Sequence, residues 1–167
     1  MTDVNRTLRL RPPRNPVERR AIGWWAVQAV VVSIPVLAPL VVVGLLVRPA
    51  RQWLLLAAAL IGVVTLFYAL VVPWIRYRVH RWEVTKDAVY TRRGWFLQQW
   101  RIAPISRIQT VDTVRGPIEQ GFALSTVTVT TASAKGAIKI EGLDRESAET
   151  LAHQLTEVTQ ATPGDAT

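Results

Sequence analysis

The sequence predicts a membrane-spanning α-helical hairpin followed by a small α+β domain, on the evidence of three observations. Two long runs near the N-terminus carry no charged side chain. After Arg76 the apolar residues alternate with the period of β-strands. From Asp144 onward they follow the spacing of an amphipathic helix. We expect the strands to form a small antiparallel β-barrel or sandwich that is capped by the C-terminal helix.

The hairpin is expected over residues 21–75. Residues 21–47 and 52–75 are uncharged, and only four residues separate the two runs. A hydrocarbon core about 30 Å thick needs about 20 apolar residues in a helix, so each run can cross it. We place the helices at about 22–47 and 52–75. The first run is much longer than the apolar part of a cleaved signal peptide, so we expect no cleavage.

The charges predict how the hairpin is oriented. The net charge is +8, and most of the positive charge flanks the two spans. Because the turn is so short, both chain ends must lie on one side, and that side carries the excess of Lys and Arg. The positive-inside rule then predicts a cell-membrane protein with both termini in the cytoplasm. This charge pattern is typical of membrane topology, and we expect no nucleic-acid partner.

The two chain ends are expected to lack packed structure. Residues 1–20 are basic and contain Pro12, Pro13 and Pro16, which favours a disordered cytoplasmic tail. The alternative is an arm that lies on anionic headgroups. Residues 161–167 are expected to be a second disordered tail.

Several residues within the spans indicate their surroundings. Tryptophans occur at the span ends and predict an interfacial belt: Trp24, Trp25, Trp53 and Trp74. Small residues form a stripe that could pack on the first span or on a second copy: Ala58, Gly62, Thr65 and Ala69. Neither span contains an ionisable side chain, which argues against a proton-coupled transporter or a channel.

Strands are predicted at residues 82–85, 88–92, 96–103, 105–115, 125–131 and 137–141. Lys86-Asp87 and Arg93-Gly94 read as turns, and Gly116-Pro117 breaks the fourth strand. Alternation places Val127 and Val129 inward. Asp144 is the expected N-cap of the final helix. The apolar stripe of that helix consists of Ala148, Leu151, Ala152, Leu155 and Val158.

Several motifs in residues 20–160 resemble the bacterial pleckstrin-homology-like (PH-like) domain of small membrane proteins, the YdbS-like family. They are Trp82-x-Val84-Thr85, Arg92-x-Gly94, the central segment Arg107-Ile108-Gln109-x-Val111-Asp112, the following Gly116-Pro117-Ile118, and the run from Leu124 to Thr131. The resemblance implies a PH-like barrel or sandwich over residues 76–160. Ala123 departs from the pattern, because a glycine is expected before Leu124.

One candidate site is a set of basic residues near the membrane. Anionic lipid could contact Arg76, Arg78, Arg81, Lys86, Arg92 and Arg93. The alternative is that these cations follow from topology alone. Polar residues around the central motif, including Gln109, Asp112 and Arg115, could pair within the sheet or face a partner, and internal pairing is favoured.

We expect no catalytic, cofactor or metal site. The chain has no cysteine and two histidines, and its sequence contains no known nucleophile, phosphate-loop or zinc motif. The predicted function is a non-enzymatic membrane-anchored scaffold. The resemblance implies that its partners are further copies of the chain or related PH-like membrane proteins. The alternatives are an accessory subunit of a membrane transport or envelope-stress complex, and an unrecognised lipid-modifying enzyme.

Overall fold

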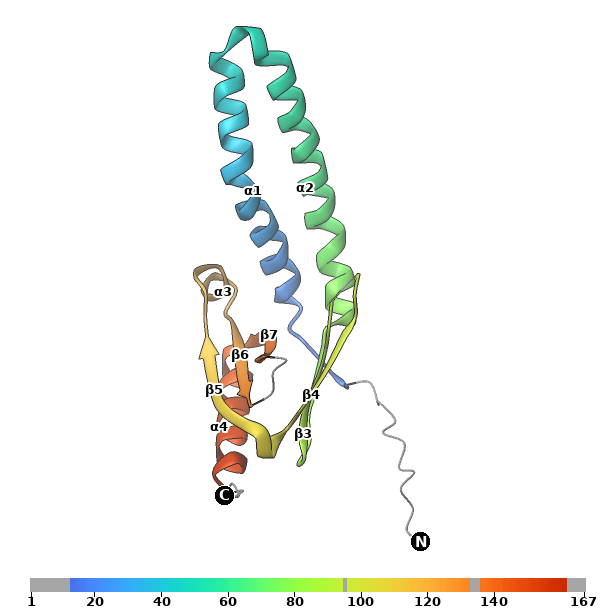
Figure 1. Cartoon of the computed structure of the whole chain (residues 1–167), viewed down its shortest axis with the longest axis vertical. Coiled ribbons are helices and arrows are strands. Elements are labelled where there is room, and N and C mark those ends of the chain that lie inside the picture. Colours follow the sequence, from blue (N-terminus) through green and yellow to red (C-terminus); the bar gives the residue numbers. More distant parts are fainter. Residues whose placement is uncertain (1–12, 95, 133–135, 162–167) are drawn as a thin grey trace.

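The computed structural model describes residues 13–94, 96–132 and 136–161. Two long antiparallel helices form a hairpin, and a smaller body of two sheets, one short helix and one longer helix lies at its open end (Figure 1). Helix α1 is Arg20–Leu46 and α2 is Arg51–Val79, joined by the 3-10 turn η1, Arg48–Ala50. The expected hairpin is therefore present, and both helices extend beyond the uncharged runs toward the domain.

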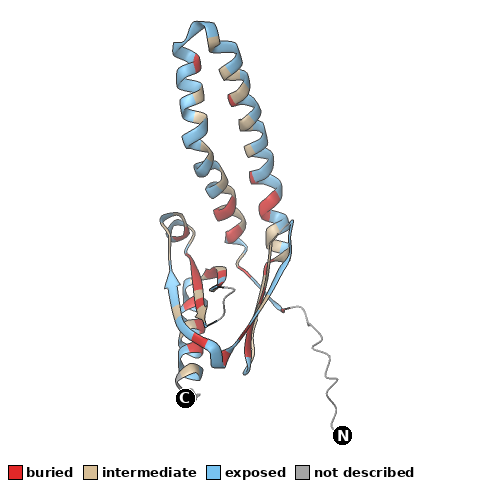
Figure 2. Cartoon of the chain, in the orientation of Figure 1, coloured by how far each residue is buried: buried red, intermediate tan, exposed pale blue. Residues whose placement is uncertain are grey.

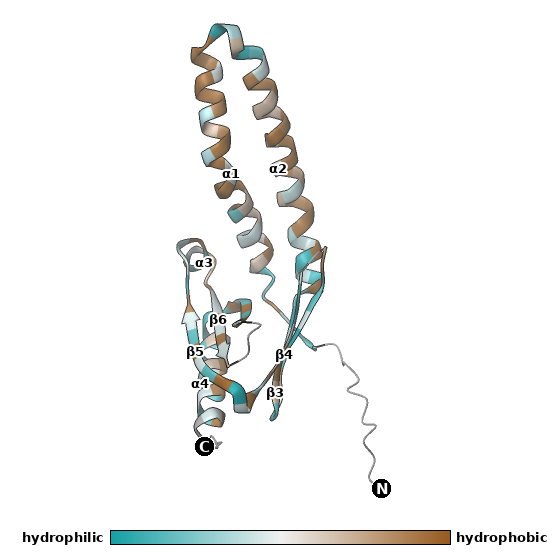
Figure 3. Cartoon of the chain, in the orientation of Figure 1, coloured by the Kyte–Doolittle hydropathy of each residue, from teal (hydrophilic) through white to brown (hydrophobic). Residues whose placement is uncertain are grey.

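The outer surface of the hairpin is apolar. Most positions along both helices are exposed (Figure 2), and their side chains are predominantly hydrophobic (Figure 3). Both helices are long and apolar enough to cross a membrane. Ala58 and Ala69 of the small-residue stripe are buried, and α2 packs along α1. These two alanines therefore lie at the contact between the two helices of one chain, whereas a Cβ on Gly62 would meet nothing within 4 Å.

The strands form two antiparallel sheets. The first has the order β1-β2-β3-β4 and the second β5-β6-β7. The strands are β1 Asn15–Pro16, β2 Arg81–Val84, β3 Ala88–Arg93, β4 Gln99–Pro104, β5 Ile108–Val114, β6 Leu124–Thr131 and β7 Ile138–Asp144. Over the described residues the sheets are not closed into a barrel. A 3-10 turn, η2 (Ile105–Arg107), links β4 to β5 and occupies the first residues of the strand predicted at 105–115.

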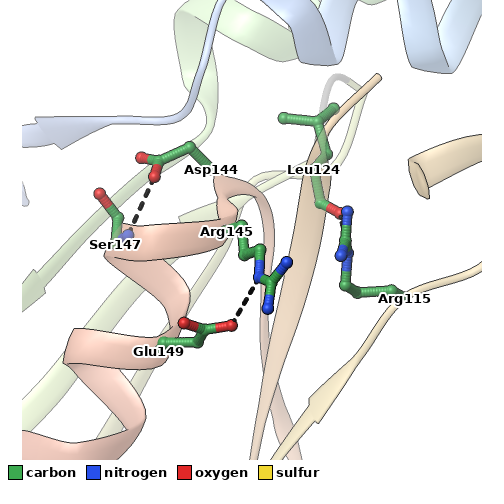
Figure 4. A network of polar contacts seen from close by, with 6 residues as sticks. All are labelled: Arg115, Leu124, Asp144, Arg145, Ser147 and Glu149. Atoms are coloured by element: carbon green, nitrogen blue, oxygen red, sulfur yellow. Dashed lines mark hydrogen bonds and ion pairs between the residues drawn. The ribbon is translucent and has the colours of Figure 1, made fainter. Parts of the chain in front are cut away.

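The core of the domain lies between the two sheets and α4, Arg145–Ala161. Val127 and Val129 are fully buried, as the alternation predicted. Ala148, Leu151 and Leu155 of the predicted stripe are buried too, whereas Val158 is exposed. Asp144 caps α4 by accepting the Ser147 backbone N–H at 2.9 Å (Figure 4).

The bend before β6 confirms the departure seen at Ala123. This alanine has a φ of +53°, in the left-handed region that favours glycine. An L-residue with a Cβ loses about 1–2 kcal/mol there. Gly116-Pro117 ends β5 as expected, and Pro117 starts a short helix, α3 (Pro117–Gly121). Helix α3 and Ala123 together turn the chain back into β6.

Two predictions about loops and tails are corrected. Residues 13–20 were expected in a disordered tail, but Pro13 and Val17 are buried and Asn15–Pro16 pairs with β2. Residues 1–12 and 162–167 lie outside the described part. The strand expected at residues 96–103 begins only at Gln99, because Gly94, with a φ of +101°, turns the chain sharply. Phe96 and Leu97 therefore lie in the β3–β4 loop.

Candidate functional site

A second apolar core joins the hairpin to the sheets. Its buried members are Val17, Ala21, Trp24, Trp25 and Leu124, with Tyr77, Trp82, Ile118 and Phe122 packed against them. They come from the arm before α1, the first turns of α1, the last turn of α2, strands β2 and β6, and the α3 region. We call this cluster the junction core. It fixes the domain against the base of the hairpin.

The backbone of the arm before α1 lies against the backbone of β7. The Glu18 N–H donates to the Gly142 carbonyl at 2.8 Å. Gly142 has a φ of +76°, and a Cβ on it would lie 2.9 Å from the Cβ of Ala21. Ala21 is itself fully buried. Only a glycine at position 142 allows the first turn of α1 to pack this closely on the sheet.

Arg76 joins three elements in the junction. Its guanidinium lies 2.5 Å from a carboxylate oxygen of Glu141 on β7 and 4.4 Å from the ring centroid of Trp25 on α1. Both members of the ion pair are partly buried, which reduces screening by solvent. Arg76 was predicted as a lipid contact. In the structure its charge serves to hold α2 to the domain and to α1.

His80 is buried at the point where α2 ends. Its ring centroid lies 5.7 Å from that of Trp25, and only 3% of the residue is exposed. Burial, together with the smaller effect of the charges of Arg76 and Arg93, lowers the pKa of His80 to about 4. The imidazole is therefore neutral at physiological pH. Among the described residues, its Nδ1 has no hydrogen-bond partner.

The other predicted lipid contacts do not form one patch. Arg78 is exposed on the last turn of α2, whereas Arg81, Arg92 and Arg93 are half-buried. Arg92 donates to Gln98 at 2.7 Å and lies 5.2 Å from the Trp100 ring centroid.

Lys86 is exposed in the β2–β3 turn, at the end of the first sheet that lies farther from the hairpin (Figure 1). Lys86 and Arg92 therefore lie toward opposite ends of the first sheet.

The residues of the central motif divide into an inner and an outer group. Ile108 is buried and Val111 half-buried, and both pack in the domain core. Arg107, Gln109 and Asp112 are exposed along β5 and the turn before it. Gly116 donates its N–H to the Glu119 carboxylate at 2.6 Å, next to exposed Pro117.

Internal pairing was favoured for the polar residues of this segment, and the structure shows it in part. Asp112 accepts the Thr110 hydroxyl at 3.2 Å. The Nε of Arg115 donates to the Leu124 carbonyl at 3.1 Å (Figure 4). Glu119 is buried and accepts the Thr126 hydroxyl at 2.6 Å. The exposed side chains of Arg107 and Gln109 leave a polar strip along the outer strand.

A groove of about 460 Å³ lies between α1 and α2 at their junction end. Its walls are mainly apolar, with Gln28, Thr65, Tyr68 and Arg76 as polar members. A second hollow of about 270 Å³ lies beside it and shares Gln28 and Arg76. No group of three His, Asp or Glu side chains that could hold a metal ion occurs in the described part of the chain.

Sequence reasoning missed the junction. Trp24 and Trp25 were assigned to the interfacial belt, but both are buried, and only Trp53 and Trp74 are exposed at span ends. One signal was present, because neighbouring helix positions point in different directions and two adjacent tryptophans cannot both face lipid equally. The partners of Trp25, Arg76 and His80, could not be deduced, because they depend on how α2 packs.

The fold and the junction define a class of protein: a membrane protein with transmembrane helices, in which a small α+β domain is packed on the base of a two-helix hairpin. The chain belongs to the bacterial PH domain family, whose model matches residues 26–159 and so includes most of the hairpin. It is 27% identical over 157 residues to the transmembrane protein YdbS of Bacillus subtilis (strain 168), covering 92% of this chain and 97% of that protein. No solved structure matches the chain.

The closeness of α1 to β7 can be tested by adding a single Cβ. Gly142→Ala is expected to lower the free energy of unfolding by about 3 kcal/mol, through a strained φ and the clash with Ala21. Gly136→Ala is the matched control, because Gly136 has nearly the same φ, +75°, with nothing within 4 Å of an added Cβ. Its expected loss is about 1 kcal/mol. Thermal unfolding of the full chain in detergent measures both, and equal losses would show that Ala21 does not lie against Gly142.

The buried imidazole predicts a pH dependence of stability. The unfolded chain binds a proton on His80 near pH 6.5, whereas the folded chain does so only near pH 4. Stability is therefore full above pH 6.5 and falls as the pH drops toward 4, by on the order of 3 kcal/mol in total. His80→Phe should flatten this part of the profile, with His153→Phe at an exposed position as the control. An unchanged slope in His80→Phe would assign the pH dependence to other groups.

Proposed function

We propose that the protein is a non-enzymatic, membrane-anchored PH-like scaffold. The hairpin crosses the cell membrane twice, both termini lie in the cytoplasm, and the two sheets with α4 form a PH-like sandwich at the cytoplasmic face. The domain presents a protein-interaction surface to another copy of the chain or to a related PH-like membrane protein. The bilayer is its second partner.

The orientation rests on the charges at the two ends of the hairpin. The turn carries Arg48 and Arg51, whereas the junction end carries Arg76, Arg78 and the cations of the first sheet. The positive-inside rule places the more basic end in the cytoplasm. The exposed indoles of Trp53 and Trp74 suit the two headgroup regions.

Because the chain has no cysteine, single cysteines can report its topology. A membrane-impermeant maleimide added outside sealed protoplasts should label Pro49→Cys, which lies in the turn. It should label Lys86→Cys, which lies in the domain, only after lysis. Labelling of Lys86→Cys in sealed protoplasts would reverse the proposed orientation.

The scaffold role rests on one observation, the exposed outer edge of β5. In the described sheet β5 pairs with β6 on one side only, and Gln109, Asp112 and Val114 are exposed along it. An exposed edge strand can pair with a strand of another chain. The junction core supports this role, since it holds the edge in a set orientation above the membrane.

The scaffold can be tested by placing a charge on this edge. The full chain purified in mild detergent is expected to form a defined homo-oligomer, measured by light scattering coupled to size-exclusion chromatography. Asp112→Lys should weaken the assembly by about tenfold or more, because edge lysines oppose strand pairing. Glu157→Lys, at an exposed position of α4, makes the same charge change as a control.

The alternative function has its own outcome. A monomer that co-purifies with a transport or envelope-stress complex, with no effect of Asp112→Lys, would contradict the scaffold and favour the accessory subunit. In that case the exposed faces of α1 and α2 would be the contact.

A further inference from the structure

The β3–β4 loop lies beside the end of α2. Strand β2 follows α2 after a single residue, and Arg81 at its start pairs with Arg92 on β3. Strand β3 runs on past this pair to Arg93, which is opposite Gln99 at the start of β4. The tip of this β-hairpin therefore lies at the membrane end of the first sheet, next to the last turns of α2 (Figure 1).

The tip presents two large apolar side chains. Phe96 is 82% exposed and Leu97 is 73% exposed, among the highest values for apolar residues in the described domain. Trp95 lies outside the described residues. The opposite end of the same sheet, at Lys86 and Asp87, is polar and exposed. The apolar tip therefore occurs at the one end of the sheet that faces the bilayer.

The loop that carries the tip is held in place at its base. Arg92 donates to Gln98 and lies over the Trp100 ring, which connects both strands to the end of the loop. The left-handed φ of Gly94 sets the turn, and a Cβ there would clash with the Leu97 carbonyl. Because the loop is constrained in this way, little conformational entropy is lost when Phe96 and Leu97 bind a surface.

The neighbouring surface indicates what covers the tip. Trp74 and Ile75 are exposed on the last turns of α2, and Arg78 follows them. Exposed indole and aliphatic groups beside arginine are typical of the headgroup boundary of a membrane. The apolar surface of the tip is thus next to a surface that the bilayer already covers. A lipid surface, rather than a soluble protein, fits this position.

We propose that Phe96 and Leu97 insert into the headgroup–acyl boundary of the leaflet from which α2 emerges. The loop is then a third attachment of the chain to the membrane, in addition to its two spans. It sets the tilt of the first sheet relative to the bilayer. This proposal rests on the membrane crossing of the hairpin and is independent of the scaffold's protein partners.

The full chain in phosphatidylcholine vesicles, with and without phosphatidylglycerol, provides the test. Phe96→Cys and Leu97→Cys are labelled separately with an environment-sensitive fluorophore, and lipids that carry a shallow nitroxide act as quencher. The labels at positions 96 and 97 should emit at shorter wavelength than a label at Lys86→Cys. The nitroxide should quench their fluorescence several-fold more strongly than that of the label at position 86. Stronger quenching with phosphatidylglycerol present would show that the nearby arginines contribute.

Two further labels separate the causes of failure. Leu60→Cys, on the exposed face of α2, should be blue-shifted and shielded from aqueous iodide if the hairpin crosses the bilayer. Emission at positions 96 and 97 equal to that at 86, with Leu60→Cys in lipid, would overturn the insertion and leave the anchored scaffold standing. An aqueous signal at Leu60→Cys would overturn the membrane crossing and the insertion together.

Discussion

The close approach of the arm and α1 to β7 is the contact on which the rest of the arrangement depends. A glycine with a left-handed φ at position 142 lets the Glu18 N–H reach the Gly142 carbonyl and lets Ala21 pack on the sheet. Trp24 and Trp25 are then placed over Leu124, and the junction core closes. Helix α2 continues into β2 with only His80 between them. The domain is thus attached through both helices, and two attachments restrict its rotation about either one.

The charges at this junction are used in two ways. Arg76 points inward, to Glu141 and the face of Trp25, and contributes to packing. Arg78, in the last turn of α2, stays exposed. His80 stays neutral there, because its burial and, to a smaller extent, the charges of Arg76 and Arg93 lower its pKa. A basic juxtamembrane segment therefore need not be a lipid-binding patch throughout.

Features with a local cause could be predicted from the sequence, and features with a distant cause could not. The two uncharged runs, the buried alternation of Val127 and Val129, and the α4 stripe at Leu151 and Leu155 follow from periodicity alone. Strand β1 has two residues, and its place depends on Gly142, more than a hundred residues later. Phe96 and Leu97 have strand-like composition, but the turn set by Gly94 moves them into the loop.

The same reasoning explains the mixed outcome for the central motif. Its apolar members, Ile108 and Val111, pack in the core of the domain, as expected of the inward side chains of a β-strand. Its polar members Gln109 and Asp112 are exposed on the outer strand, where the core places no demand on them. Because the junction core joins the domain to both helices, this polar edge has a set orientation relative to the base of the hairpin. For the scaffold proposed above, this set orientation would favour a partner strand carried by another membrane-anchored chain over one from a freely diffusing protein.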